Sequence, residues 1–199
     1  WLPVDSLEQL FAQAAGLYPI LKAKVQHWAG HPDCRGMFPV NASEDRGRFD
    51  FWGDMVEQYG EEGADARVKW PSLKGTERAI EKLVRVYEGR AYRLLDICRQ
   101  SIVFEEPEQL AQCLKQIRED ADVDVVAIKN RLTDDYDARA LSLGYRDVNI
   151  NLRIYNERTK KHGINPHICE VQLLLKSFSE YKSVAGHKRY VAFRNARGR

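Results

Sequence analysis

The stretch GYRDVNINLRIY, residues 144–155, alternates aliphatic and polar side chains with a period of two. One parity holds Val148, Ile150, Leu152 and Ile154, and the other holds Asp147, Asn149, Asn151 and Arg153. This alternation predicts a β-strand with an aliphatic face and a polar face. The polar parity begins with Tyr145 and continues with an acid, two amides and a cation. We consider two interpretations: a face that is simply solvated, and a face that forms the floor of a binding site.

Four further segments have the composition and length of strands, and helical stripes separate them. The strand-like segments are ARVKW (66–70), the second half of RLLDICRQSIVF (93–104), DVDVVAIKNRL (122–132) and HICEVQLLL (167–175). Apolar residues at helical spacing lie within 79–87 and again after Pro107. This order of elements predicts an α+β fold, in which helices pack on a mixed β-sheet of about five strands.

The N-terminal part is expected to be a helical and loop segment, residues 1–62, that packs on an α/β domain of residues 63–199. The boundary is placed at GEEGADA (60–66), where the pattern changes. Aromatic residues are frequent before it, including Trp1, Trp28 and Trp52. They could form a docking surface for a protein partner, although core packing is the commoner use of such side chains.

Local signals place two helices and a loop in this N-terminal segment. Ser6 and Gln9 have the spacing of a capping box, which predicts the start of the first helix. A second helical stretch is expected over residues 17–28. Residues 29–53 are rich in Gly, Pro, Asp and Asn, which predicts a loop.

Composition limits the class of protein. The 199 residues are 44% hydrophobic and 30% charged, as in soluble globular proteins. The net charge of +2 does not indicate nucleic-acid binding by itself. No run approaches the roughly 18 apolar residues of a membrane span, so we expect a soluble protein that does not bind a membrane. A targeting signal cannot be read from this sequence.

The four cysteines are widely spaced and include no CxxC pair, which argues against a zinc knuckle. They are Cys34, Cys98, Cys113 and Cys169. The last three lie in apolar segments, which is typical of buried free thiols. A reducing compartment, the cytoplasm or an organelle interior, is the expected setting, with two disulfides as the alternative.

The segment RVKWPSLK carries a candidate polyphosphate site. Arg67 and Lys69 share strand parity and would project from one face. Ser72 and Lys74 follow where a helix begins, and the N–H groups of a helix start favour anions. A solvated basic edge strand is the alternative.

Two acids are candidates for metal binding. Asp96 directly follows apolar residues, while Glu170 shares strand parity with Gln172. A carboxylate on a hydrophobic strand is costly unless a cation or a donor accompanies it. Two carboxylates on adjacent strands suit Mg²⁺, which leaves coordination positions for substrate phosphates. In the alternative interpretation each acid pairs with an arginine, such as Arg99 or Arg153.

Two basic groups are weaker candidates. Lys129 and Arg131 end a predicted strand, a position that is usually solvated. HKRYVAFRN (187–195) predicts a basic and aromatic helix that could contact phosphate or RNA, although such helices more often cap a domain. No Walker A, GxSxG or GxGxxG motif is present.

In this order the motifs resemble the synthetase domain of the RelA/SpoT-type alarmone synthetases, a nucleotidyltransferase-like fold. That pattern runs RxK, a helix start with Ser and Lys, an Asp ending a strand, a Lys at a strand end, GYxSxH and ExQ. The matching segments are RVKWPSLK, LLDICRQSIVF, AIKNRL, GYRDVN and CEVQL. The resemblance covers about residues 67–199.

The resemblance implies transfer of pyrophosphate from ATP to the ribose 3′-OH of a guanosine or other nucleotide acceptor. It implies Mg²⁺ held by Asp96 and Glu170, with Gln172 supporting the catalytic acid. Tyr145 would stack on the base of the acceptor. The implied nucleotide-binding set is Arg67, Lys69, Ser72, Lys74, Lys129, Arg131, Tyr145, Asp147 and Asn149.

The sequence departs from that pattern at positions that matter for activity. Asp147 replaces the Ser of GYxSxH, and Asn149 replaces its His. Leu174 and Leu175 follow ExQ where Arg-Thr is usual, and Arg99 follows Asp96 at a shorter spacing. These departures imply altered acceptor specificity or lost catalysis. The second hypothesis is therefore an inactive domain that serves as a nucleotide-binding or structural subunit of a larger assembly.

Overall fold

The computed structural model describes residues 6–41, 47–142 and 144–179. Trp1 and the basic segment at 187–195 lie outside these residues. The elements, in chain order, are α1 (Leu7–Gly30), β1 (Met37–Pro39), β2 (Phe49–Phe51), α2 (Trp52–Arg67), α3 (Thr76–Tyr87), the 3₁₀ turn η1 (Ala91–Arg93), β3 (Arg99–Phe104), α4 (Pro107–Glu119), β4 (Val123–Asn130), α5 (Ala138–Ser142), β5 (Val148–Ile154), α6 (Glu157–Lys161), β6 (Cys169–Leu175) and α7 (Lys176–Ser179).

The strands form one mixed sheet in the order β2-β1-β3-β6-β5-β4. β3 and β6 are parallel, and the other neighbouring pairs are antiparallel. The predicted α+β architecture is confirmed, with six strands in the described residues where about five were expected. β1 and β2 come from the region predicted as a loop, and that prediction was wrong. Each has only three residues, too few to show a period of two.

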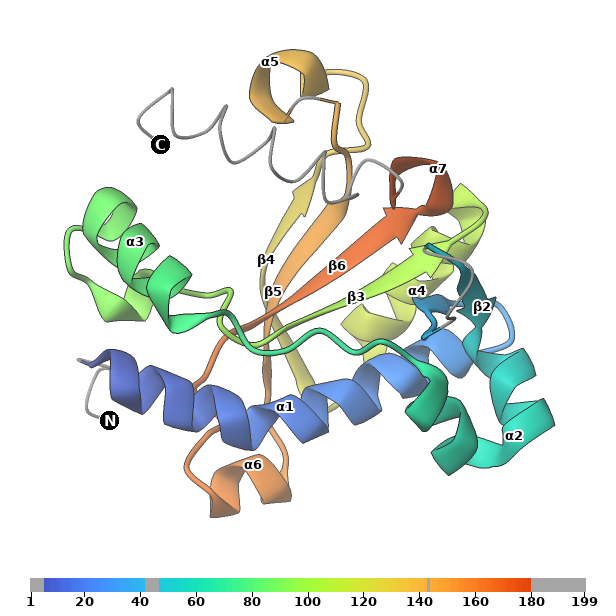
Figure 1. Cartoon of the computed structure of the whole chain (residues 1–199), viewed down its shortest axis with the longest axis horizontal. Helices are drawn as coiled ribbons and strands as arrows, with labels where there is room; N and C mark the ends of the chain where they lie inside the picture. Colours follow the sequence, from blue (N-terminus) through green and yellow to red (C-terminus); the bar gives the residue numbers. More distant parts are fainter. Residues whose placement is uncertain (1–5, 42–46, 143, 180–199) are drawn as a thin grey trace.

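The aliphatic face of the sheet forms the main core under α1 and α4 (Figure 1). The four aliphatic residues predicted to share one face of β5 are at most 2% exposed. Burying one such side chain stabilises a fold by about 1.5–3 kcal/mol. The opposite face carries the polar parity, as the sequence predicted.

α1 is a single helix of 24 residues, where the sequence predicted two stretches. Its N-terminus has the predicted cap, because the Ser6 hydroxyl accepts from the Gln9 N–H at 3.1 Å. Pro19 lies inside the helix without ending it. Its buried residues lie along one side: Leu10, Ala14, Leu17, Ile20, Leu21, Val25, Trp28 and Ala29. This continuous stripe on the sheet outweighs the local cost of a proline.

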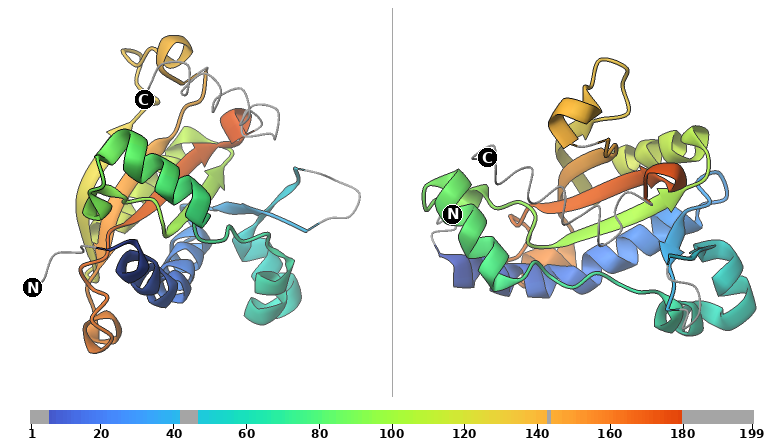
Figure 2. Two further views of the ribbon diagram at one scale, coloured as in Figure 1. Left: turned by 60° about the vertical axis from the view of Figure 1, so that its left-hand side comes forward. Right: turned by 45° about the horizontal axis from the view of Figure 1, so that its top comes forward.

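The predicted strand at 66–70 is also wrong. α2 continues to Arg67, and only Val68 pairs in β fashion, as an isolated bridge to Val40. GEEGADA lies within α2, which kinks at Gly60, a residue with φ 71°. Residues 68–75 then cross to α3, so α2 and α3 lie at opposite ends of the molecule (Figures 1 and 2).

The aromatic residues of the N-terminal third pack inside the protein. Trp28 is 2% and Trp52 is 6% exposed. The Trp52 ring packs against Phe38, with ring centroids 5.7 Å apart. The predicted docking surface is therefore wrong for these two tryptophans, which serve the core. No helix in the described part of the chain is long and apolar enough to cross a membrane.

Candidate functional site

The polar side of the sheet brings together residues of three strands. In the register of β5 and β6, Asn149 lies opposite Gln172 and Asn151 opposite Glu170. β3 places Arg99 beside Glu170. The polar face predicted for the sheet therefore brings residues with amide, carboxylate and guanidinium groups side by side. Side-chain Oδ1 of Asn151 is buried and has no hydrogen-bond partner in the described residues.

Glu170 is oriented by its neighbour two residues further along the strand. The Gln172 Nε2 donates to Glu170 Oε1 over 2.9 Å. Arg153, one proposed partner, pairs instead with Asp124 at 2.5 Å. Glu170 forms no ion pair with a lysine, arginine or histidine in the described ranges. Its carboxylate is therefore available on the floor.

Asp96 is 8% exposed and is held by two lysines. Lys74 Nζ lies 2.6 Å and Lys82 Nζ 3.0 Å from the same oxygen, Oδ2. Oδ1 is buried and has no partner among the described residues. The sequence analysis considered an arginine as the partner of Asp96, but two lysines pair with it instead. Lys82 was not among the residues predicted for the site. Its signal was weak: it lies on α3 three residues after Ala79, the buried residue of that helix.

Burial and charge compete at this cluster. Burial alone would raise the pKa of Asp96, but Lys82 and Lys74 outweigh it and hold that pKa below its ordinary value. Burial, helped by the charges of Lys82 and Arg99, lowers the pKa of Lys74 despite its bond to Asp96. Burial also opposes the charge on Lys82, yet Asp96 raises the pKa of this lysine. The acid is therefore ionised between two ammonium groups.

Several observations bear on whether Asp96 and Glu170 could hold a magnesium ion together. The Glu170 N–H donates to the Cys98 carbonyl at 3.0 Å, which places Glu170 beside the segment that carries Asp96. Asp96 Oδ1 and Asn151 Oδ1 are buried oxygens without a partner in the described residues, as expected where an ion or water is to bind. No group of three His, Cys, Asp or Glu residues gathers in the described structure. Mg²⁺ does not require one, since it commonly uses one or two carboxylates with waters and substrate phosphates.

Tyr145, Asp147 and Arg131 form a second cluster, at the segment that leads into β5. Asp147 is 0% exposed and forms an ion pair with Arg131. The Tyr145 hydroxyl donates to Asp147 Oδ2 over 3.0 Å. Burial and the Asp147 charge raise the pKa of Tyr145, so the phenol stays protonated. The Tyr145 ring packs on Met37, Val103 and Leu174, which we call the Met37 cluster.

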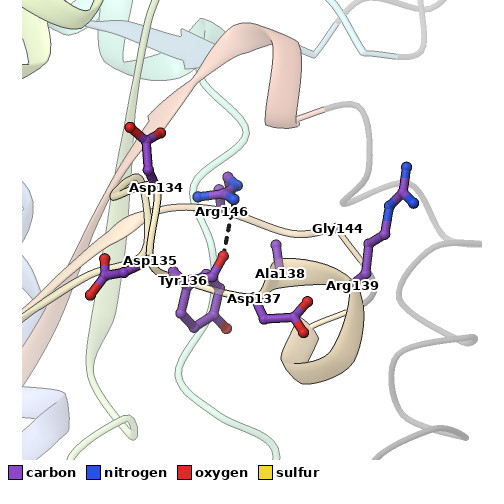
Figure 3. A pocket seen from close by; sticks show the side chains of 8 residues that line it. All are labelled: Asp134, Asp135, Tyr136, Asp137, Ala138, Arg139, Gly144 and Arg146. Carbon is purple, nitrogen blue, oxygen red and sulfur yellow. Dashed lines mark hydrogen bonds between the residues drawn. The ribbon is translucent and has the colours of Figure 1, made fainter.

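The loop from β4 to α5 lines a surface cavity of about 490 Å³ beside this cluster (Figure 3). Residues 134–139, Gly144 and Arg146 line it. Arg146 donates to the carbonyls of Arg131, Thr133 and Tyr136 at 3.0, 2.8 and 3.0 Å. Arg146 therefore braces the loop next to Tyr145, a role that the sequence did not indicate.

The remaining predicted nucleotide-binding residues are placed differently. The Arg67 guanidinium stacks on the Tyr59 ring at 3.6 Å, and the Lys69 N–H donates to the Pro39 carbonyl at 2.8 Å. Ser72 is exposed on the segment towards α3. Of RVKWPSLK, Lys74 is the residue that reaches Asp96.

Lys129 and Asn149 lie opposite each other in the register of β4 and β5. Lys129 is exposed at the edge of the sheet, while Asn149 is 6% exposed. Both therefore belong to the polar face on which Glu170 and Gln172 lie.

No protein-family model matches the chain, and no curated protein matches it by sequence. Solved structures do resemble it. Small alarmone synthetase 2 from Bacillus subtilis superposes with a TM-score of 0.58 at 13% identity, over 95% of this chain and 82% of that one. Small alarmone synthetase 1 from the same organism, bound to its product pppGpp, gives 0.58 at 13% identity, over 92% and 79%.

A type VI effector, in complex with its immunity protein, also resembles this chain. The TM-score is 0.51 at 16% identity over 88% of this chain, which spans 63% of the effector. Identities at this level show the fold and leave activity open. This chain has the fold of the small alarmone synthetases, at 13% sequence identity to the two Bacillus subtilis proteins.

Proposed function

We propose that this domain is a Mg²⁺-dependent nucleotide pyrophosphokinase that transfers pyrophosphate from ATP to the 3′-OH of a guanosine nucleotide. The observation that carries the proposal is the Asp96 carboxylate, which two lysines hold through one oxygen while the other is buried without a partner among the described residues. A buried acid of this kind, near a second carboxylate on a polar floor, suits a cation that accompanies phosphates. The pppGpp complex of a protein with this fold supports the acceptor class.

The charged residues have separate roles in this proposal. Lys74 and Lys82 bind the phosphates of ATP, while Asp96 and Glu170 hold the metal. Bound Mg²⁺ supplies neutralisation of phosphate charge and polarisation of the phosphoryl oxygens. Gln172 keeps Glu170 in place through its 2.9 Å hydrogen bond. Arg67, Lys69, Ser72 and Lys129 stay predicted contacts to ATP.

The acceptor binds with its base on Tyr145. Its 3′-oxygen bonds to the β-phosphorus of ATP as the bond from that phosphorus to the α,β-bridging oxygen breaks, so AMP leaves with that oxygen and the hydroxyl proton passes to solvent. Such a transfer needs mainly alignment and charge neutralisation. Asn149 can offer hydrogen bonds to the acceptor but cannot take a proton near neutral pH.

The test is incubation of folded protein with γ-³²P-labelled ATP and Mg²⁺ against GDP, GTP, ADP and tRNA. We expect labelled product with GDP or GTP, and its loss in Glu170→Gln. Asp124→Asn is the matched control, because Asp124 is an exposed carboxylate at the sheet edge that pairs with Arg153. Absence of product across the whole panel would refute the enzymatic proposal.

The second candidate is a nucleotide-binding or structural subunit without catalysis. It is favoured by Asp147 and Asn149 in place of Ser and His, and by the exposed apolar residues of α3. Ile80 is 48% and Val84 is 67% exposed. Calorimetry decides between the candidates: nucleotide that binds to wild-type protein without turnover supports this second function.

A further inference from the structure

Asp147 is fully buried, and both of its carboxylate oxygens are engaged. Arg131 donates to Oδ1, and the Tyr145 hydroxyl donates to Oδ2 over 3.0 Å. The Arg131 backbone N–H also donates to the Asp147 carbonyl at 2.8 Å. A buried carboxylate is stable in this form because a cation and a hydrogen-bond donor accompany it. Asp147 therefore presents no free negative charge to an approaching nucleotide.

The side chain and backbone of Tyr145 are both constrained. Its ring packs on the Met37 cluster, and its hydroxyl is tied to Asp147. Its backbone is tied to Ser142 in both directions: the Tyr145 N–H donates to the Ser142 carbonyl at 3.2 Å, and the Ser142 hydroxyl donates to the Tyr145 carbonyl at 2.6 Å. The orientation of the ring is thus set before any ligand arrives.

We propose that Asp147 is a positioning residue, which fixes the Tyr145 ring to stack on the purine base of the acceptor while Arg131 neutralises its charge. The proposal rests on the function proposed above and adds the means by which this chain orders its acceptor site. A ring ordered before binding loses less conformational freedom when a base stacks on it. The benefit falls on the acceptor and not on ATP, whose phosphates are assigned to Lys74 and Lys82 at the other cluster.

The pairing also accounts for a departure from the motif GYxSxH. An aspartate at the serine position would repel an anionic nucleotide if its charge were free. Arg131 donates to one carboxylate oxygen of Asp147 and Tyr145 to the other, so the positive charge of Arg131 balances the negative charge of Asp147.

The experiment is a double-mutant cycle on nucleotide binding, measured by calorimetry with GDP and ATP separately. The variants are Tyr145→Phe, Asp147→Asn and the two combined. Tyr145→Phe keeps the ring and removes only the donated hydrogen bond. Since a hydrogen bond to a charged group is lost, we expect about 10-fold weaker GDP binding in each single variant. ATP affinity should change by less than about twofold. The double variant should bind GDP as weakly as the weaker single variant does, because the effects of two residues that act through one hydrogen bond do not add.

Two further variants test whether a structural disturbance, and not the lost hydrogen bond, explains a loss of affinity. Asp147→Asn leaves the Arg131 charge without its partner, so Arg131→Gln combined with Asp147→Asn removes both charges together. This pair should show the same selective loss of GDP affinity if Asp147 acts through Tyr145. Asp124→Asn, at an exposed ion pair of the same sheet, should bind both nucleotides as wild type does.

Several outcomes overturn the proposal. Unchanged GDP affinity in folded Asp147→Asn shows that the aspartate does not order the acceptor site. Equal losses for GDP and ATP show a general structural effect, and additive losses show that Asp147 and Tyr145 act independently. Wild-type protein that binds no guanosine nucleotide refutes the acceptor site altogether. Wild-type protein that binds GDP but makes no product refutes only the catalytic part of the proposed function, because the binding cycle still decides the role of Asp147.

Discussion

At Asp96, one oxygen accepts from two ammonium groups while the other is buried without a partner in the described residues. Two cations on one acid exceed what is needed to stabilise a single negative charge. The excess positive charge suits polyphosphate, and the free oxygen suits a metal ion. Lys82 is the less expected member, because it comes from α3 and from outside the motif RVKWPSLK.

The first prediction concerns Lys82 at this cluster. Lys82→Met keeps most of the aliphatic stem but removes the charge, so we expect KM for ATP to rise by about 10-fold or more, as a charge-assisted hydrogen bond is lost. KM for the acceptor should change little. Steady-state kinetics with each substrate varied in turn measures both values. Lys160→Met at an exposed lysine of α6 is the control, and an unchanged KM for ATP in folded Lys82→Met would exclude Lys82 from the site.

The second prediction concerns His167, which is 2% exposed and whose ring nitrogens have no partner among the described residues. Burial lowers its pKa to about 4. The unfolded chain, with a pKa near 6.5, binds a proton in the range where the folded chain does not. Stability is therefore present above about pH 6.5 and is lost as pH falls towards 4, by up to about 3 kcal/mol.

Urea unfolding at several pH values measures this effect. His167→Leu should remove this part of the pH dependence while the rest of the acid sensitivity remains. Identical slopes for wild type and variant between pH 4.5 and 6.5 would count against the buried neutral histidine.

At the scale of elements, β5 carries both a core face and the face on which we propose the nucleotide site. Its aliphatic face packs in the main core, and its polar face forms the floor beside β6. A strand separates the two because successive side chains point to opposite faces. Substitutions at neighbouring residues of β5 should therefore affect different properties: the stability of the fold on the aliphatic face, and ligand binding on the polar face.

The third prediction compares Ile150 with Asn151. Ile150 is 0% exposed, so Ile150→Ala should cost about 2–5 kcal/mol of unfolding free energy through the lost burial and the cavity left behind. Asn151→Ala should cost less stability and should weaken Mg²⁺-dependent nucleotide binding, because Asn151 lies opposite Glu170 in the strand register and its Oδ1 has no partner in the described residues. Urea unfolding and calorimetry measure the two effects, and the reverse pattern would contradict the assignment of the faces.

At the scale of the whole molecule, the fold buries every cysteine as a free thiol. Burial raises the pKa of Cys98 to about 12 and raises the pKa of Cys169 well above its usual range. The hydrogen bond with Cys34, together with burial, raises the pKa of Cys113 well above its usual range. A hydrogen bond with Cys113 lowers the pKa of Cys34 despite burial. The buried free thiols expected for Cys98, Cys113 and Cys169 are confirmed, and the alternative of two disulfides is not formed.

The fourth prediction follows from this burial. Native protein should react with an aromatic disulfide reagent at well under one thiol per chain within minutes, because a thiol must be exposed as thiolate to react. In denaturant all four thiols should titrate. The first native reaction should be at Cys34, so Cys34→Ser should slow it further. Rapid reaction of all thiols in native protein would show that the core opens readily.

Sequence reasoning worked where the signal was local. The alternation of β5 and the strand-like segments at 93–104, 122–132 and 167–175 predicted the main strands, because a period of two is set by consecutive residues. It failed where packing overrides local preference. The short strands β1 and β2 form by pairing with each other, and Ala66 and Arg67 extend α2 instead of starting a strand.

By itself the sequence determined an α+β fold, a strand with one polar face, and the acids Asp96 and Glu170 as candidates for one site. Only the tertiary structure decided the partners of those acids. Asp96 meets Lys74 and Lys82, and Asp147 meets Arg131. The physical reason is that periodicity depends on neighbours along the chain, whereas the partner of a buried charge depends on which segments the folded core brings beside it.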